Sequence, residues 1–526
     1  MLKAILSMSV ATTLSRITGY VRTMVQAAVL GSGVVVSNAY TFSNSLPNQV
    51  YELFMGGLLS SIFIPILIDR MSQHGEPDAR RLTNALLTII VPVLTVVALV
   101  SIVFAAPLVG LATDFRVTET FTAEDARQAE ELSVLLFRVF ALQILFYGLG
   151  AVAMGVLNAH RRFFLPTFAP VLNNLIVITS FIGYALLDSS SPSAAIYVLA
   201  GGTTLGVAVM SLVLLPAMWS LGYRPRIVAG HLALASAARL PGPMLVFIAA
   251  SVGVQFTANY FGSAFSGVDQ LWYAFTIFSL PYGIFIVSIA TALVPDLSEK
   301  YANRDTDGYR DTLSFGLRTM AFIAVPASIG MVALAEPIVG LLYERGEFGL
   351  EDTRAVAAIL VAYGVGLLGY GAYFVLVRSF YARQNTRTPA TLNVGLLLIY
   401  ILLAYTLSAP VGLGLPGVAL AFSAAYGALA IGLLITMRRE TRTLDGRRMA
   451  VSLAKILVAG AIMYVVASIG VSLTGVGTNA LTRVVIIFLV GGVAVAAYLS
   501  VSFLLKTEEL KSAVSLVRRH SIKVSS

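Results

Sequence analysis

Apolar segments recur along the whole chain, and they constrain its fold more than any other feature. Each is about twenty residues long, the length that an α-helix needs to cross the hydrocarbon core of a bilayer. Because backbone polar groups inside a bilayer must bond to one another, such segments fold as helices. The sequence predicts fourteen spans, at residues 3–30, 38–68, 84–112, 132–157, 168–187, 195–220, 241–264, 270–295, 318–336, 354–377, 389–408, 414–437, 450–470 and 481–505.

The sequence also resembles itself at positions six predicted spans apart. Segments 158–166 (NAHRRFFLP) and 381–389 (YARQNTRTP) share an Ala and a Pro seven residues apart, and Ser-Leu-Pro occurs at both 45–47 and 279–281. An even displacement keeps the topology, so these are parallel repeats. We therefore predict an all-α polytopic membrane protein with two six-helix lobes and two further helices. The predicted parts are 1–220 with a cytoplasmic linker to about 240, 241–440, 441–505, and a basic cytoplasmic tail at 506–526.

Basic residues are concentrated on one side of the predicted spans. The chain is 58% hydrophobic and 12% charged, with a mean hydropathy of +0.86, which excludes an ordinary soluble protein. Of the 35 Lys and Arg residues, 26 lie near the termini or in alternate loops, whereas the opposite loops hold four. This distribution explains the net charge of +9 by topology rather than by nucleic-acid binding. Both termini are predicted to be cytoplasmic.

Motifs of soluble enzymes are missing from the sequence. There is no cysteine, and the four histidines (His74, His160, His231 and His520) lack metal-ligand spacing. No Walker A sequence is present, so ATP hydrolysis by this chain is not expected. We therefore predict a protein that is not an enzyme, with no catalytic residues, no metal and no cofactor.

The first two predicted spans carry unusual polarity. Arg16, Arg22 and Glu52 lie in otherwise apolar sequence, where a charge normally faces a cavity or a partner. Arginine suits a phosphate because its guanidinium donates bidentate hydrogen bonds and stays charged. Pairing of one arginine with Glu52 is the alternative explanation. The same spans contribute Asn38 and Asn48, which we expect to line the cavity.

Glu52 is the only acidic residue that we place within the core of a span. A cation exporter needs carboxylates in its cavity to bind the cation and to titrate. The cavity is therefore predicted to be neutral or positive, which favours an anionic substrate.

Two predicted cytoplasmic loops carry basic residues next to a proline. Their composition fits either plain positive-inside topology, with proline starting the next helix, or a gate between the lobes. The gate candidates are Asn158, Arg161, Arg162, Arg378, Arg383, Thr386 and Pro389.

These motifs together resemble the MurJ (MviN) family of lipid II flippases, in the multidrug/oligosaccharidyl-lipid/polysaccharide exporter superfamily. The resemblance covers essentially the whole chain. It is carried by Ser15-Arg16 with Gly19 and Arg22, by Leu46-Pro47-Asn48 with Phe63-Ile64-Pro65, by Leu157-Asn158 through Phe168-Ala169-Pro170, by Leu293-Val294-Pro295-Asp296-Leu297-Ser298, and by Arg378-Ser379-Phe380-Tyr381-Ala382-Arg383 through Thr386-Arg387-Thr388-Pro389.

The resemblance implies a function and a site. The substrate would be lipid II, the undecaprenyl-pyrophosphate-linked precursor of peptidoglycan, moved from the inner to the outer leaflet of the bacterial cytoplasmic membrane by alternating access. Arg16 and Arg22 match positions that engage the pyrophosphate. Residues 450–470 and 481–505 would form a groove for the polyprenyl tail. Membrane potential, rather than ATP, would drive transport, and the cell-wall synthesis machinery would be a partner.

Several positions depart from the family pattern. Thr23, Asn38, Gly56 and Thr276 replace charged residues, and Glu52 is additional in the Tyr51-Glu52 stretch. We keep Thr276 among the cavity-lining candidates. The departures fit either a divergent branch with a rearranged cavity or a flippase for another polyprenyl-linked glycan. A cation-coupled drug exporter is a second alternative. A non-transporting scaffold for wall synthesis is a third, and it would tolerate loss of both arginines.

Overall fold

Helices make up the structure, a computed structural model that describes residues 2–52, 63–118, 121–233, 242–441 and 445–511. Within these ranges the only strand-like pairing is a single bridge between Arg345 and Phe348. The prediction of an all-α polytopic protein is confirmed. In the same ranges eleven helices, or twelve if one bent pair counts as a span, are long and apolar enough to cross a membrane.

The predicted count of fourteen spans is not reached among the described residues. The difference lies at the N-terminus, where α1 (Leu2–Leu30) and α2 (Val35–Glu52) coincide with the first two predicted spans but are not among the eleven. Their arginines, asparagines and other polar residues lower the hydropathy of both helices. The other twelve predicted spans each coincide with a helix or a helix pair. Residues 53–62, within the second predicted span, lie outside the described ranges.

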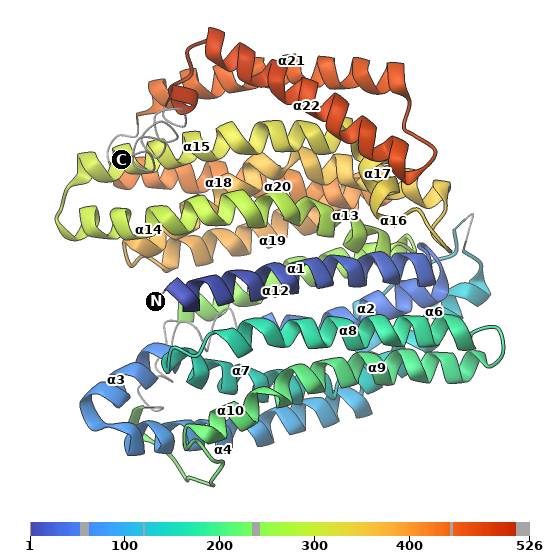
Figure 1. Ribbon diagram of the computed structural model, residues 1–526, viewed down its shortest axis with the longest axis vertical. Coiled ribbons are helices and arrows are strands. Elements are labelled where there is room, and N and C mark those ends of the chain that lie inside the picture. Colours follow the sequence, from blue (N-terminus) through green and yellow to red (C-terminus); the bar gives the residue numbers. More distant parts are fainter. Residues whose placement is uncertain (1, 53–62, 119–120, 234–241, 442–444, 512–526) are drawn as a thin grey trace. The chain divides into compact units, whose positions relative to one another are not determined.

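The first compact unit comprises residues 1–248 with two later segments, 263–269 and 345–349. Along α4, Leu86, Ile90 and Leu94 recur every four residues and are buried, the spacing of one helix face. Figure 1 shows α1, α8 and α9 side by side within this unit. Its remaining helices are α3 (Ile64–His74), α4 (Glu76–Val103), α5 (Ala105–Ala112), α6 (Ala123–Phe140), α7 (Gln143–Ala159), α8 (Phe164–Leu187), α9 (Pro192–Leu212) and α10 (Leu214–Ser220).

The turn between α1 and α2 is completed by both later segments. Gly31 and Gly33 have φ of 69° and 70°, which glycine adopts without steric cost. The Gly33 N–H donates to Asp269 Oδ2 at 2.9 Å, and the Glu347 N–H donates to the Ala28 carbonyl at 2.9 Å. Residues far apart in the sequence therefore close one small turn.

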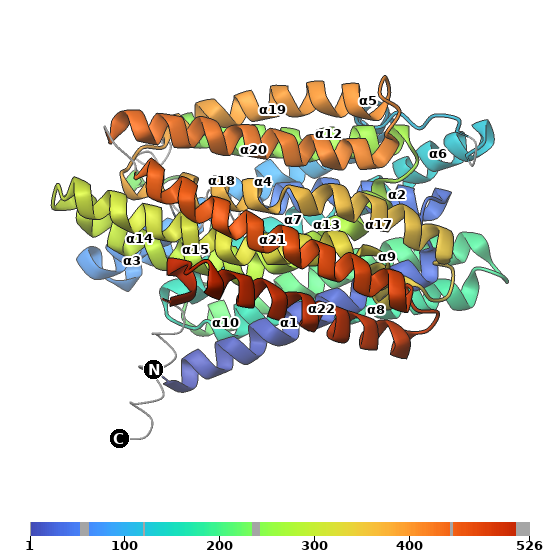
Figure 2. The ribbon, with the colours of Figure 1, turned by 90° about the horizontal axis from the view of Figure 1, so that it is seen from above.

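The second unit comprises residues 249–262, 270–344 and 350–526. It includes the last two helices, which the sequence predicted as a separate part. Figures 1 and 2 both show α21 and α22 side by side, and Figure 2 shows α19 beside α20. Its helices are α12 (Gly242–Ala264, shared with the first unit), α13 (Val268–Pro281), a π-helical turn (Tyr282–Ile286), α14 (Val287–Ala302), α15 (Thr306–Ala333), α16 (Ala335–Tyr343), α17 (Leu350–Val365), α18 (Leu367–Ala382), α19 (Arg387–Ser408), α20 (Gly414–Glu440), α21 (Gly446–Thr474) and α22 (Ala480–Leu504).

Equivalent predicted spans of the two units are broken at equivalent places. The third and ninth spans divide into α4–α5 and α15–α16, and the fourth and tenth into α6–α7 and α17–α18. The α17–α18 bend is 47° and has a visible cause. The Ser423 hydroxyl donates to the Ala362 carbonyl at 2.7 Å, and a Cβ on Gly366 would lie 2.3 Å from that hydroxyl. The shared breaks agree with the repeat seen in the sequence.

Buried ion pairs attach the last two helices, α21 and α22, to the rest of the second unit. Near one end of α22, Arg483 donates to Glu344 Oε1 at 2.6 Å. Beyond its other end, Glu509 Oε1 accepts a hydrogen bond from the Arg318 guanidinium at 2.9 Å and another from the Ser452 hydroxyl at 2.7 Å. The side chains of Arg318 and Glu509 are only 7% and 2% exposed, so each charge is stabilised by the opposite charge rather than by water.

We expect Arg318→Ala to destabilise the second unit by about 3–5 kcal/mol, because Glu509 would be left as a buried charge without its cation. Arg448→Ala is the matched control, because Arg448 bonds Glu508 on the surface, where both side chains are about half exposed. A surface pair contributes about 1 kcal/mol or less. Thermal unfolding of both variants in one detergent measures the difference. Equal losses would contradict the assignment of the buried pair.

Candidate functional site

Arg16 and Arg22 lie on α1 and face two different environments. Arg16 is exposed and Arg22 is half-buried. Six residues separate them, which is about 9 Å along the helix and about 120° around it. Among the described side chains neither arginine has an ion-pair partner. The predicted pairing with Glu52 falls on a side chain outside the described residues, and so does the departure at Gly56.

A hydrogen-bonded polar cluster joins α2 to α7 within the first unit. The Tyr147 hydroxyl donates to Asn48 Oδ1 at 2.5 Å, and the rings of Tyr147 and Tyr51 lie 4.7 Å apart.

Tyr147 was missed by the sequence analysis. The usable signal is that a tyrosine within an apolar helix needs a partner for its hydroxyl. Asn48 supplies that partner here.

Asn38 is completely buried and fully engaged in hydrogen bonds. Its Nδ2 donates to the Ser266 carbonyl at 2.8 Å and to the Val34 carbonyl at 3.1 Å. Its Oδ1 accepts from the Val268 N–H at 2.9 Å. The side chain therefore holds segment 263–269 against α2 within the first unit, and it lines no open cavity in this structure.

Thr276 lies in the second unit, next to a large aromatic cluster. Its hydroxyl donates to the Trp272 carbonyl at 2.9 Å, one turn earlier in α13. The adjacent Phe275 packs against Tyr363 and Phe422, with centroids 5.6 and 5.8 Å away. The cluster continues through Phe278, Tyr282, Tyr370, Tyr373 and Tyr426. Sequence reasoning gave these rings no role, and their packing shows that they build the core of the second unit.

The two repeated loops end their preceding helices in the same way. Arg161 and Gln384 have φ of 57° and 58°, in the left-handed region where glycine is usual. The same pair of backbone hydrogen bonds, a Schellman motif, closes α7 and α18. The match in backbone extends the match in sequence between these loops.

The structure places the gate candidates of the first loop at a cavity of about 560 Å³. Asn158 and Arg161 line it, together with Met8 of α1 and Ile64 and Ile68 of α3. Arg162 points elsewhere and donates to the Ser220 hydroxyl at 3.3 Å. This loop therefore presents one cation at an otherwise largely apolar cavity.

Two gate candidates of the second loop, Arg378 and Arg383, are held by contacts with other side chains. The guanidinium carbon of Arg378 lies 5.1 Å from the Phe374 ring centroid, and Arg383 bonds Glu440 at 2.8 Å. Thr386 immediately precedes α19, and Pro389 is buried in the first turn of that helix. The proline thus starts a helix, as one of the two predictions for these loops requires.

An apolar cavity of about 520 Å³ lies within the second unit, between α15, α18, α20 and α21. Leu368, Ile431 and Leu453 are among its apolar lining residues, and Arg318 and Arg438 lie at its border. Of the two helices predicted to form a lipid-tail groove, α21 lines this cavity. Among the described residues, no group of three His, Cys, Asp or Glu side chains is arranged to hold a metal ion.

The fold and these sites define a multi-pass membrane transporter built from two repeated helical units. Apolar side chains such as Phe488 and Leu489 of α22 remain exposed, at 76% and 57%, as expected of faces that contact lipid. The chain belongs to the MurJ family, since the family model described as lipid II flippase MurJ matches residues 26–485. It is therefore a transporter and not an enzyme.

Two curated relatives illustrate the match. Lipid II flippase MurJ of Burkholderia cenocepacia is 29% identical over 76% of each chain. A probable lipid II flippase MurJ of Bdellovibrio bacteriovorus is 30% identical over 99% of this chain and 97% of its own length.

Solved structures agree on the fold. A lipid II flippase MurJ in an inward closed conformation superposes with a TM-score of 0.76 at 24% identity, over 94% of this chain and 97% of its own. An inward-facing MATE transporter of the MOP superfamily superposes with a TM-score of 0.65 at 16% identity, over 84% of this chain and 99% of its own. The predicted MOP-type architecture is confirmed.

We expect Asn38→Asp to lower stability by about 1–3 kcal/mol, because the new carboxylate would face the Ser266 and Val34 carbonyls without an N–H to donate. Asn48→Asp is the comparison, since it loses one amide hydrogen bond, to the Asn44 carbonyl at 2.9 Å, while its oxygen still accepts from Tyr147. Thermal unfolding of the two variants compares them. A loss for Asn48→Asp as large as that for Asn38→Asp would contradict this account.

Proposed function

We propose that this protein moves lipid II from the inner to the outer leaflet of the bacterial cytoplasmic membrane by alternating access. One observation carries the proposal: Arg16 and Arg22 sit on an apolar helix, with no ion-pair partner among the described side chains. A permanent charge at membrane depth is costly unless it faces a water-filled cavity or a partner, and a charge with such a cavity marks a substrate path. The pyrophosphate of lipid II is a dianionic group that two guanidinium groups can bind through bidentate hydrogen bonds.

Each arginine has a distinct task in this proposal. Arg22 is half-buried and has no ion-pair partner among the described side chains, so its guanidinium donors are available to the phosphate. Arg16 is more exposed and lies about one and two-thirds turns earlier on α1. A pyrophosphate would contact Arg16 and Arg22 at different depths as it moves. No covalent bond of the substrate changes in this process.

The apolar cavity of the second unit is a suitable place for the polyprenyl tail. It is lined by four helices and bordered by Arg318 and Arg438. Burial of an isoprenoid chain there is favoured by the hydrophobic effect. The pyrophosphate and the tail would thus be held by different parts of the protein.

Orientation and energy source complete the proposal. The concentration of Lys and Arg in alternate loops supports cytoplasmic termini. We infer that membrane potential drives transport without a bound cofactor, and that the cell-wall synthesis machinery receives the product. A flippase for a different polyprenyl-linked glycan is not favoured, because the matched relatives are named as lipid II flippases.

We expect Arg16→Ala and Arg22→Ala each to abolish growth rescue in a bacterium depleted of its own lipid II flippase, because each removes a phosphate-binding guanidinium. Outer-leaflet lipid II is scored in parallel. Arg127→Ala is the matched control, since Arg127 is exposed and pairs only with Glu124 and Glu131 on its own helix among the described residues. Normal growth and normal outer-leaflet lipid II with either α1 variant would refute the assigned site.

We expect Gly427→Leu to reduce flipping while leaving the fold intact. Gly427 lines the apolar cavity, and a Cβ added there meets no atom within 4 Å, so the leucine would fill space meant for the tail. Gly395→Leu on α19 is the control, because it also meets no atom but does not line the cavity. Reconstituted flipping and thermal unfolding are measured for both. Equal activity in the two variants would exclude this cavity as the tail site.

A further inference from the structure

Two loops of the first unit converge on the start of α4. Glu76 and Asp78 lie in its first turn, where the helix dipole favours acidic residues. Glu76 binds His160 of the α7–α8 loop at 3.0 Å and the Tyr223 hydroxyl at 2.9 Å. Asp78 binds His231 at 3.2 Å. Two of the four histidines of the chain are therefore fixed to neighbouring carboxylates.

The surroundings of His160 require one more proton than a neutral ring and a carboxylate supply. Its Nδ1 lies 2.9 Å from the Val156 carbonyl oxygen, and its Nε2 lies 3.0 Å from Glu76 Oε1. Both neighbours are acceptors, and a neutral imidazole carries a hydrogen on only one nitrogen. A neutral ring can therefore satisfy either contact but not both, and both are hydrogen bonds at once only when the pair holds an added proton.

Tyr223 does not supply that proton. Burial, and then its hydrogen bond to Glu76, raise the pKa of Tyr223 well above its usual value, so the phenol keeps its hydrogen and donates to Glu76 Oε2. The Tyr223 ring also stands edge-on to the His160 ring, with centroids 5.2 Å apart. Glu76 thus receives hydrogen bonds on both oxygens.

His231 shows the opposite arrangement and serves as an internal comparison. Its Nδ1 accepts from the Ala233 N–H at 3.2 Å, so only Nε2 needs a hydrogen to reach Asp78. A neutral His231 satisfies both contacts. The two histidines occupy similar places and differ in the number of protons that their contacts require.

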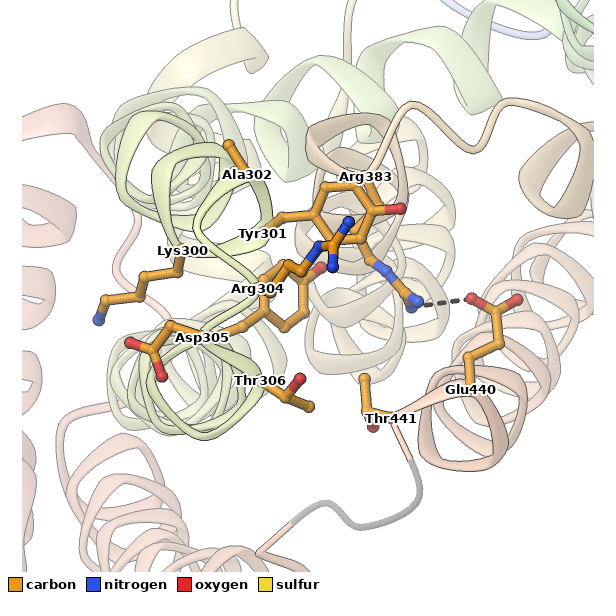
Figure 3. A pocket seen from close by; sticks show the side chains of 10 residues that line it. Lys300, Tyr301, Ala302, Arg304, Asp305, Thr306, Arg383, Glu440 and Thr441 are labelled. Carbon is orange, nitrogen blue, oxygen red and sulfur yellow. Dashed lines mark ion pairs between the residues drawn. The ribbon is translucent and has the colours of Figure 1, made fainter.

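The internal repeat places a permanent cation where His160 stands. Arg383 lies 223 positions after His160 in the sequence, in the matching loop of the second unit. Figure 3 shows Arg383 directed at Glu440, at 2.8 Å. Arg383 also lies 5.5 Å from the Tyr301 ring centroid, as His160 lies against Tyr223. Each loop therefore combines a cation, a carboxylate and a tyrosine, and only the first unit uses a cation that can lose its charge.

Other charged groups near His160 are few. Arg80 of α4 is 4.0 Å from Glu76 and stacks on Tyr223, with its guanidinium carbon 5.8 Å from the ring centroid. Asp78 is shared between His231 and Arg70 of α3. Arg161 and Arg162 follow His160 in its own loop. Glu76 is the only acidic side chain that bonds the ring among the described residues.

We propose that His160 and Glu76 form a proton-binding site that fastens the α7–α8 loop to α4. With the proton bound, both ring nitrogens donate and the imidazolium faces the carboxylate, so the loop is held most firmly at low pH. When the proton is lost at higher pH, the neutral ring gives up one of the two contacts and the ion pair, so the loop is held less firmly. Arg161 of this loop and Asn158, in the last turn of α7, line the neighbouring cavity, so protonation at this site sets how firmly these residues are held. This inference does not depend on the identity of the transported lipid.

The absence of cysteine from the chain allows a direct test. A spin label on a single Arg162→Cys reports loop mobility by electron paramagnetic resonance in lipid nanodiscs. The expected result is an immobilised label at about pH 5 and a mobile one at about pH 9, since histidine changes its charge within this interval. The same spectrum at every pH would overturn the proposal.

Variants on the labelled background identify the responsible group. His160→Gln is expected to give a mobile label at all pH values, and Glu76→Gln to remove the pH dependence by a second route. His231→Gln is the matched control and is expected to keep the transition. An unchanged transition in a folded His160→Gln protein, verified by thermal unfolding, would assign the effect to another group and refute the proposal.

A gain of pH response provides an independent test in the second unit. The spin label is placed on Asn385→Cys, with and without Arg383→His. The Arg383→His protein is expected to show a pH-dependent change in label mobility that the protein with Arg383 lacks. Its absence would count against the proposal, because residue type at this position would then not set the pH response.

Discussion

The cost of taking a charge out of water governs where the charged side chains of this protein lie. Arg318 and Arg483 are buried, and each bonds a carboxylate within its own unit. Arg16 and Arg22 have no such pairing among the described side chains, although they lie on an apolar helix. The contrast separates cations that hold the fold together from cations that remain available to an anionic ligand.

Much of the fold could be predicted because the bilayer leaves a chain few choices. Runs of apolar residues gave the helices, and the matches between 158–166 and 381–389 gave the repeat. Helix breaks were not predicted, because they depend on contacts between helices. Ser423, on α20, bonds the carbonyl of Ala362 and so bends α17–α18. The sequence around the bend contains no signal of this partner beyond Gly366.

The candidate site was predictable only in part. Two arginines in an apolar run can be recognised in a sequence, because their cost there is high. The role of Asn38 could not be recognised, since its partners Ser266 and Val268 lie more than two hundred residues away. The partnership of His160 with Glu76 was hidden for the same reason. A polar residue in an apolar helix reveals a need for hydrogen bonds, but the fold decides whether a ligand or the protein meets it.

The turn between α1 and α2 has a consequence for biosynthesis. The Gly33 N–H donates to the Asp269 carboxylate, 236 residues later, and the Ala28 carbonyl accepts from the Glu347 N–H. A ribosome releases the first unit's helices long before these residues exist, so the N-terminal half enters the membrane with this corner open. The first unit is finished only after residues 249–262 and 270–344 of the second have been synthesised, and the two units therefore cannot mature one after the other.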